Sequence, residues 1–427
     1  FPGCSTFNNI QSLVFDQAFN KKDNMLVCAP TGAGKTNVAL LTILQELKQH
    51  IIAKQGLPSV VNQNDSFLIV YITPMKALAT EIKEKFTNSL RHLKVNVKEY
   101  TGDTRVPASE LERSHILVAT PEKWDIATRR GGEDAPSARL KLLIIDEIHL
   151  LQDDRGPVLE ALVARTLRQV EQTQSMIRIV GLSATLSNCQ DVGRFLRCSD
   201  DGLFIFGPEY RPVPLAMTLI GAKNVEQTPP AYKTVYDEAY QPNRDKDVIQ
   251  IDVIAVELIK NIIAEKHQVL IFVHTRGETA RFARFLAKFI NLPPSDQLQQ
   301  LLSKKSLQPQ LRECLQSGVG IHHAGLPRND RLFVENAFRQ NAFQVLICTA
   351  TLAWGVNLPA HTVIIKDTKV YNQEHGGFED IGILDVHQMF GRAGRPQFDT
   401  SGHAILITTN KALPKYLLMP NLSNLNS

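Results

Sequence analysis

Short apolar runs recur along the whole chain and alternate with stretches in which apolar residues have helical spacing. The runs are short, continuous and rich in β-branched residues, which is typical of parallel strands that helices cover on both faces. They lie at residues 24–28, 67–72, 116–119, 142–145 and 177–182, and again at 269–273, 319–321, 344–348, 363–365 and 404–408. The pattern therefore predicts an α/β protein with two mainly parallel sheets in tandem.

The two sets of runs are separated by residues 207–247, which contain six prolines and have a poor helical pattern. A chain of 427 residues is long for one core, and two domains of about 200 residues are expected. We therefore place the first domain at residues 1–207, a proline-rich boundary at 208–247, and the second domain at 248–427.

The composition, with 43% hydrophobic and 21% charged residues, is that of an ordinary globular protein. No apolar run approaches the ~18 residues that span a bilayer, so we expect no membrane association. The six cysteines lack metal-ligand spacing, which indicates reduced thiols in the nucleus or cytosol. A net charge of +4 permits a nucleic-acid partner without demanding one. The first residues hold neither Met nor a signal peptide, so we expect a fragment of a longer protein.

Residues 29–36 read Ala-Pro-Thr-Gly-Ala-Gly-Lys-Thr and stand between a predicted strand and a predicted helix. In such a turn, backbone N–H groups and the helix N-terminus surround a phosphate. Lys35 would contact the β- and γ-phosphates, and the hydroxyl of Thr36 would bind Mg²⁺. A chance glycine-rich loop is the alternative, and Ala29 stands where the usual pattern has Gly. We expect ATP to bind at Thr31, Gly32, Ala33, Gly34, Lys35 and Thr36, with Mg²⁺.

Two carboxylates, Asp146 and Glu147, follow the apolar run at 142–145. The carboxyl ends of parallel strands are where α/β sheets bind ligands. Asp146 is suited to hold Mg²⁺, and Glu147 is suited to orient and deprotonate the attacking water. A strand that ends in solvated acids is the alternative, and the glycine-rich loop upstream argues against it.

A third group lies near the C-terminus, in residues 385–396. Helical spacing predicts that Gln388, Arg392 and Arg395 share one helix face, with Pro396 ending the helix. Two guanidinium groups without an acidic neighbour indicate an external anion, and the γ-phosphate held by the first domain is the obvious candidate. The alternative is a solvated basic helix end. We predict that all three residues contribute to catalysis.

With these groups in place, the chain resembles the superfamily 2 DExH helicases of the superkiller-like branch over nearly its whole length. The resembling motifs lie at residues 7–12, 73–78, 101–103, 120–124, 272–276, 322–326 and 349–359. The resemblance implies two RecA-like domains with helices on both faces of each sheet and an ATP site in the cleft between them. It implies that Gln11 binds adenine and that Gly355 and Asn357 contact the nucleotide.

Residues 154–160 and 397–399 are similar to the large two-cassette helicases of the spliceosome and of a transcriptional cointegrator complex. Residues 164–178 and 381–386 resemble most the N-terminal cassette of the cointegrator type. This resemblance implies other subunits of such a complex as partners and movement in the 3′-to-5′ direction. It also implies winged-helix and ratchet domains beyond the C-terminus.

The motifs predict a nucleic-acid path made of hydroxyl groups, backbone N–H groups and cations, which bind phosphate and sugar without reading bases. Each threonine alone is at least as well explained as a helix cap. The adjacent residues His322 and His323 point opposite ways on a strand, which argues against a metal site. The predicted contacts are Thr73, Pro74, Lys76, Gly102, Thr120, Pro121, Lys123, Thr275, Arg276, His323, Gly325, Thr349 and Thr351.

Residues 370–381 contain Gly376 and Gly377 between aromatic and apolar residues, which suggests a tight turn with two short arms. Pattern alone favours an unremarkable surface loop. The family resemblance implies a hairpin that separates strands, on which Tyr371 or Phe378 would stack against the last base pair.

Together these features predict an ATP-dependent helicase that moves on a single strand or a 3′ overhang. The choice between RNA and DNA stays open, because contacts to the phosphate backbone are common to both. Two alternatives are a catalytically weak cassette that serves as a binding module, and a translocase that does not separate strands. The complete set of Lys35, Asp146, Glu147, Arg392 and Arg395 argues against the first.

Overall fold

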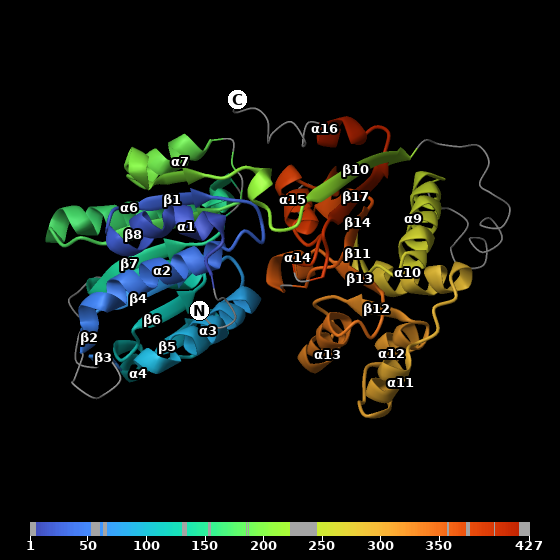
Figure 1. The fold of residues 1–427 in the computed structure, drawn as a ribbon, viewed down its shortest axis with the longest axis horizontal. Helices are drawn as coiled ribbons and strands as arrows, with labels where there is room; N and C mark the ends of the chain where they lie inside the picture. Colours follow the sequence, from blue (N-terminus) through green and yellow to red (C-terminus); the bar gives the residue numbers. More distant parts are fainter. Residues whose placement is uncertain are drawn as a thin grey trace. The chain divides into compact units, whose positions relative to one another are not determined.

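The computed structural model describes residues 6–52, 60–62, 66–129, 135–152, 155–184, 186, 188–222, 246–356, 358–372, 376–396 and 398–417. The chain divides into two compact units, Phe1–Arg211 and Pro212–Ser427. Each unit has its own parallel sheet flanked by helices (Figure 1). The prediction of two α/β domains with mainly parallel sheets is therefore confirmed.

The sheet of the first unit has the strand order β5-β6-β4-β7-β8-β1-β9, and every neighbouring pair is parallel. Its central strands are buried along their whole length, as their unbroken apolar sequence requires. The strands are β1 (Met25–Cys28), β4 (Leu68–Ile72), β5 (Val97–Tyr100), β6 (Ile116–Ala119), β7 (Leu140–Ile145), β8 (Arg178–Ser183) and β9 (Leu203–Ile205). A separate antiparallel pair is formed by β2 (Ile51–Ile52) and β3 (Val60–Val61).

Helices cover this sheet, with α2 against β7 and β8, α3 against β5 and β6, and α7 against β1 and β9. Successive strand residues serve opposite faces: Val180 joins the core under α2, whereas the next residue, Gly181, lies against Leu196 and Leu26. A β-carbon at Gly181 would lie 2.7 Å from Leu196, so a larger residue does not fit there. The helices are α1 (Asn9–Phe15), α2 (Lys35–Leu47), α3 (Lys76–Ser89), α4 (Ala108–Glu112), α5 (Pro121–Arg129), α6 (Gly156–Thr173) and α7 (Cys189–Phe195).

The sheet of the second unit has the order β10-β17-β14-β11-β13-β12, again with all pairs parallel. Its strands are β10 (Leu215–Ala222), β11 (Val269–Val273), β12 (Val319–His322), β13 (Val345–Thr349), β14 (Thr362–Lys366) and β17 (Gly402–Thr409). Its helices are α9 (Lys246–Ala264), α10 (Arg276–Phe289), α11 (Asp296–Ser303), α12 (Pro309–Gln316), α13 (Arg328–Arg339), α14 (Thr351–Gly355), α15 (Ile383–Phe390) and α16 (Leu413–Leu417).

Strand β10 lies inside the stretch that the sequence suggested was a boundary. It pairs residue for residue with β17, from Leu215 opposite Gly402 to Ala222 opposite Thr409. Most of its side chains are half-buried or exposed, because it is an edge strand, and its apolar pattern is correspondingly weak. The second unit therefore begins at Pro212, well before the predicted start at residue 248. Residues 223–245 lie outside the described residues.

An antiparallel hairpin follows β14, with arms β15 (Lys369–Asn372) and β16 (Gly377–Asp380). Tyr371 stands opposite Phe378, and their rings meet edge to face with centroids 5.4 Å apart. Gly376 has a φ of +63°, which suits the turn. Two arms are therefore present where pattern alone favoured a loop, and residues 373–375 lie outside the described residues.

The predicted helix through Pro396 is wrong, because α15 ends at Phe390. The chain then turns, and Ala393 forms a parallel bridge with Ala360, supported by Gly394 N–H donating to the Ala360 carbonyl at 2.7 Å. Gly394 has a φ of +84°, which a helix does not allow. Gln388 is consequently on α15, whereas Arg392 and Arg395 are on the turn beyond it. No helix among the described residues is long and apolar enough to cross a membrane.

Candidate nucleotide and nucleic-acid sites

The loop at residues 29–36 connects β1 to α2 and has the backbone of a phosphate-binding turn. Gly32 and Gly34 have φ values of +83° and +92°, and Gly34 is the N-cap of α2. The space beside Gly32 is open, with no atom within 4 Å of where a β-carbon would be. Residues with a β-carbon disfavour these positive φ values, so glycine suits both positions. The backbone N–H groups of the loop and the positive end of α2 can then contact one bound anion.

Gln11 and Asn8 fasten α1 to this loop. Each accepts a hydrogen bond from the other's backbone N–H, as a capping box. The Asn8 amide also donates to the Ala33 carbonyl at 2.9 Å, and the Gln11 amide lies against Gly34. The residue predicted to bind adenine is thus next to the residues predicted to bind phosphate.

Lys35 begins α2 and turns back over the loop. Its Nζ donates to the carbonyl oxygens of Ala29, at 2.8 Å, and Pro30, at 3.2 Å. These two oxygens occupy two of the three ammonium N–H donors, which phosphate oxygens would otherwise take. Thr36 follows in the same first turn and is half-buried.

Asp146 lies directly after β7, where its N–H donates to the Ile72 carbonyl of the neighbouring strand. The Tyr71 hydroxyl donates to Asp146 Oδ2 at 2.6 Å. Burial, and next the Glu147 carboxylate, raise the pKa of Asp146 to about 6, while the Tyr71 hydrogen bond and Lys35 oppose the rise. A buried carboxylate whose charge is disfavoured gains most from a nearby cation, which suits a Mg²⁺ ligand.

Glu147 has a left-handed backbone with φ +52°, a strained conformation for a residue other than glycine. Its Oε2 is buried, lies 3.5 Å from His149 Nδ1, and has no hydrogen-bond partner among the described residues. The same Nδ1 lies 3.4 Å from both Ser183 Oγ and Ala184 N, at the end of β8. His149 therefore connects the two strand ends, and the neighbouring Thr185 lies outside the described residues.

These residues fit a nucleotide with Mg²⁺. The glycine turn leaves room for a phosphate, the Lys35 ammonium is close by, and the Glu147 carboxylate has an unsatisfied buried oxygen. Thr36 and Asp146 supply the oxygen ligands that Mg²⁺ prefers.

Five of the seven nucleic-acid residues predicted in the first unit line one pocket of about 550 Å³. Lys76 pairs with Asp103 at 2.6 Å, and Lys123 lies 5.0 Å from the centre of the Tyr100 ring. Thr73 is buried and Pro121 begins α5, and neither lines the pocket. The lining contains the predicted residues Pro74, Lys76, Gly102, Thr120 and Lys123, together with Met75, Glu122, Ile126 and Arg155, which the sequence analysis missed.

In the second unit, the predicted contacts lie at the carboxyl ends of β11, β12 and β13. Thr275 is the N-cap of α10 and accepts from the Glu278 N–H, so the capping interpretation holds for this threonine. Gly325 N–H donates to His323 Nδ1 at 3.1 Å, and a β-carbon on Gly325 would be 3.2 Å from Arg276 Cδ. The two loops therefore touch. Thr349 and Thr351 hydroxyls are 2.9 Å apart after β13.

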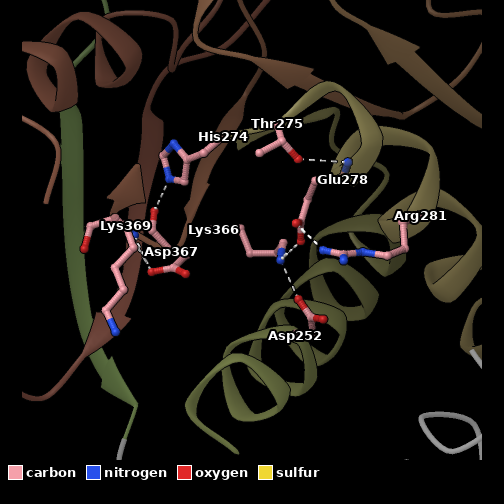
Figure 2. A network of polar contacts seen from close by, with 9 residues as sticks. Asp252, His274, Thr275, Glu278, Arg281, Lys366, Asp367 and Lys369 are labelled. Atoms are coloured by element: carbon pink, nitrogen blue, oxygen red, sulfur yellow. Dashed lines mark hydrogen bonds and ion pairs between the residues drawn. The ribbon is translucent and has the colours of Figure 1, made fainter. Parts of the chain in front are cut away.

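A buried ion-pair network holds the first turn of α10 in place (Figure 2). Lys366, at the end of β14, donates to Asp252 of α9 and at 2.8 Å to Glu278 of α10, which also pairs with Arg281. Burial alone would raise the pKa of Glu278, but Lys366 and Arg281 outweigh it and lower the pKa to about 2. The carboxylate therefore stays charged, and α10 presents Thr275 and Arg276 from a fixed start.

Asp367, the residue directly after β14, supports the same loop and the hairpin. The His274 ring lies with Nε2 2.7 Å from the Asp367 carbonyl, next to Thr275 (Figure 2). Asp367 has φ +73°, and its carboxylate accepts from the N–H groups of Thr368 and Lys369, where β15 begins. The predicted strand-binding loop and the hairpin thus share one support.

The two arginines beyond α15 have different partners. Arg392 donates to the Ala353 carbonyl of α14. Arg395 is held by both carboxylate oxygens of Asp399 at 2.9 Å and by the side-chain oxygens of Gln268 and Asn341. The expectation that both arginines lack an acidic neighbour is therefore wrong for Arg395, because the turn brings Asp399 back onto its guanidinium.

The remaining predicted residues are only partly placed. Gly355 ends α14, the helix that Arg392 contacts, and Gln388 is buried in α15. Asn357 lies outside the described residues. His322 is buried with Nε2 2.9 Å from Glu335, so it belongs to the core of its unit.

Comparison with known proteins agrees with this geometry. Residues 8–192 match the family described as DEAD/DEAH box helicase, and residues 254–397 match the helicase conserved C-terminal domain. The chain thus has a DEAD/DEAH box helicase domain in its first unit and a helicase conserved C-terminal domain in its second. The two parallel-sheet units are its tandem RecA-like domains.

Three relatives show where in this family the chain falls. It is 48% identical over 432 residues to activating signal cointegrator 1 complex subunit 3 of Homo sapiens, and 47% identical over 431 residues to the protein of that name in Dictyostelium discoideum. It is 47% identical over 436 residues to the DExH-box ATP-dependent RNA helicase DExH14 of Arabidopsis thaliana. These alignments cover 98%, 99% and 98% of this chain, but 19% of each relative.

Proposed function

We propose that this chain hydrolyses ATP to move along one nucleic-acid strand in the 3′-to-5′ direction and to separate it from its complement. The observation that carries the proposal is the pairing, in one domain, of a glycine cradle with a buried, unsatisfied carboxylate oxygen on Glu147. The pocket lined by Lys76 and Lys123 supports the strand-binding part. The DExH-box relative, whose name specifies RNA, favours RNA as the strand.

In this mechanism the N–H groups of the loop and Lys35 bind the phosphates, and Gln11 selects adenine. Thr36 and Asp146 would hold Mg²⁺, which would supply positive charge beside the phosphates. Glu147 orients a water and accepts its proton. Arg392 of the second domain acts on the transferred phosphate.

The strand is held by groups from both domains. In the first domain these are Thr73, Pro74, Lys76, Gly102, Thr120, Pro121 and Lys123; in the second they are Thr275, Arg276, His323, Gly325, Thr349 and Thr351. These groups contact phosphate and sugar, so binding has little base preference. Tyr371 and Phe378 on the exposed hairpin meet the last base pair. We place this activity inside a multi-subunit complex, as the name of the cointegrator relatives suggests, and in the nucleus or cytosol, as the free cysteines favour.

The Glu147→Gln variant tests the proposal. The amide keeps the size of the side chain but cannot accept the proton, so we expect ATP to bind while strand-stimulated turnover falls by at least about 100-fold. Phosphate release and nucleotide binding are measured on the same preparation. Glu171→Gln is the control, because Glu171 lies in the last turn of α6, is exposed and pairs with Arg197. Unchanged turnover in Glu147→Gln would remove the residue from this role.

A further inference from the structure

Arg155 lies in the resembling stretch 154–160, to which no role has been assigned. It is the N-cap residue of α6, and its guanidinium lines the same pocket as Lys76 and Lys123. It donates to the Pro74 carbonyl, and its Nε lies 3.4 Å from Glu122 Oε1. The side chains of Arg155 and Glu122 remain 42% and 49% exposed, so both can reach a ligand in the pocket.

The charges in the pocket favour an anion. Among the residues that line it, three are cations and Glu122 alone is acidic. An ion pair that is half exposed to water is worth about 0–1 kcal/mol, so a phosphate displaces Glu122 from Arg155 at little cost. A guanidinium can bind a phosphate with two parallel N–H groups, which an ammonium cannot.

The position of Arg155 is fixed from both sides. A β-carbon on the next residue, Gly156, would lie 2.2 Å from the Leu151 carbonyl, so α6 begins in tight contact with the turn that follows Glu147. Farther along, Arg165 of α6 pairs with the buried Asp125 of α5. Helix α5 carries Glu122, so these two contacts set the place of Arg155 relative to its partner.

Resting on the proposed function, we propose that Arg155 binds a backbone phosphate of the single strand directly and that Glu122 weakens this binding by competing for the guanidinium. The ligand class is a phosphodiester of RNA or DNA. Because only three residues lie between Glu147 and Leu151, the same contact ties an occupied pocket to the turn that carries the catalytic carboxylate.

The test is binding of a fluorescent 12-nucleotide uridine strand to the full chain, measured by anisotropy between 50 and 300 mM KCl. Arg155→Gln keeps an amide donor for the Pro74 carbonyl but removes the charge. We expect about tenfold weaker binding at 100 mM salt and a salt slope shallower by about 0.7, the value for one phosphate contact on a single strand. Glu122→Gln should bind more tightly than the unmodified protein.

Two comparisons separate a phosphate contact from a structural role. Arg155→Lys should restore the slope, and Glu122→Gln/Arg155→Gln should bind like Arg155→Gln alone, because Glu122 acts through Arg155. Lys98→Ala is the control, since exposed Lys98 pairs with Glu110 outside the lining and should leave the slope unchanged. An unaltered slope in Arg155→Gln, with strand binding intact in the unmodified protein, would overturn this inference alone. Absence of strand binding in the unmodified protein would overturn the proposed function with it.

Discussion

At the scale of single residues, the two neighbouring carboxylates of the nucleotide site differ in their surroundings. Asp146 accepts a hydrogen bond from the Tyr71 hydroxyl, whereas Glu147 has a strained backbone and a buried side-chain oxygen without a hydrogen bond among the described residues. This division suits one carboxylate that holds a cation and one that accepts a proton. The sequence indicates both roles from the order of the two acids, but it cannot show that Tyr71, 75 residues earlier, completes the site.

Tyr71→Phe should change the pH dependence of ATP turnover. Below a pH of about 6 Asp146 takes up a proton and no longer attracts Mg²⁺, so kcat/KM should fall as the pH drops through that value. Loss of the hydroxyl removes a bond that favours the charged form, so the midpoint should rise by about 0.5–1 pH unit. Rate measurements from pH 5 to 8 check this, with Tyr210→Phe as control. An unshifted midpoint would mean that Tyr71 does not act on Asp146.

Arg392→Ala and Arg395→Ala should fail in different ways. Arg392→Ala should lower kcat by at least about 100-fold with little change in melting temperature, because it removes charge from the transition state. Arg395→Ala removes the guanidinium from Asp399 and from Gln268 Oε1, so the buried carboxylate keeps only the backbone N–H of residue 395 and the buried amide oxygen loses its donor. That loss should cost about 2–4 kcal/mol of the free energy of unfolding.

The measurements are thermal unfolding and steady-state kinetics on both variants, with Arg395→Lys as a partial replacement. A loss of kcat in Arg395→Ala at unchanged stability would restore the interpretation that both arginines act on the γ-phosphate.

At the scale of elements, the sequence predicts best what one stretch of chain decides. The central strands and the turn at residues 29–36 follow from unbroken apolar runs and from two glycines. The sequence does not show the end of α15, because Ala393 and Gly394 pair with Ala360, a residue far back along the chain. Strand β10 was missed because its partner strand lies about 190 residues later and its side chains are half exposed.

Among the pocket residues, too, the sequence predicts those that stand in a local motif and not those that the fold brings together. Lys76 and Lys123 stand in recognisable motifs, but Arg155 joins them only through the packing of α6 beside α5. A charged residue before a helix is common, so no local signal distinguishes it. Its contact with the Pro74 carbonyl spans 81 positions of the sequence and becomes visible only in the fold.

The hairpin β15–β16 allows a test of strand separation that is independent of hydrolysis. Tyr371 and Phe378 are 55% and 74% exposed, so replacing both with Ala should leave the fold intact. We expect duplex displacement to fall by at least about tenfold, because base–aromatic stacking is worth about 1–3 kcal/mol per base, while strand-stimulated phosphate release persists.

Replacing residues 373–378 with a Gly-Ser linker should have the same effect. Leu332→Ala is the matched control, since Leu332 is an exposed apolar residue on α13 of the same unit. Preserved unwinding in the hairpin variants would leave the hairpin as a surface loop. Joint loss of both activities would assign it to support of the fold.

At the scale of the whole molecule, the chain contains two complete parallel sheets, each with its own core and its own share of the predicted residues. Nucleotide-binding groups and the pocket lie in the first unit, whereas the arginines and the hairpin lie in the second. Neither unit alone holds the full set that the proposed function requires. The chain also amounts to 19% of each compared relative, so the partners of those long proteins are not a property of this segment by itself.

The pairing of β10 with β17 has a consequence for cutting the protein into pieces. Because β10 covers eight residues of β17, a fragment of residues 248–427 would leave that row of N–H and C=O groups bare. A bare flat edge recruits another chain, so we expect this fragment to self-associate, whereas residues 212–427 stay monomeric. Sedimentation of the two fragments at equal concentration checks this. A monomeric short fragment would show that β17 tolerates solvent along its edge.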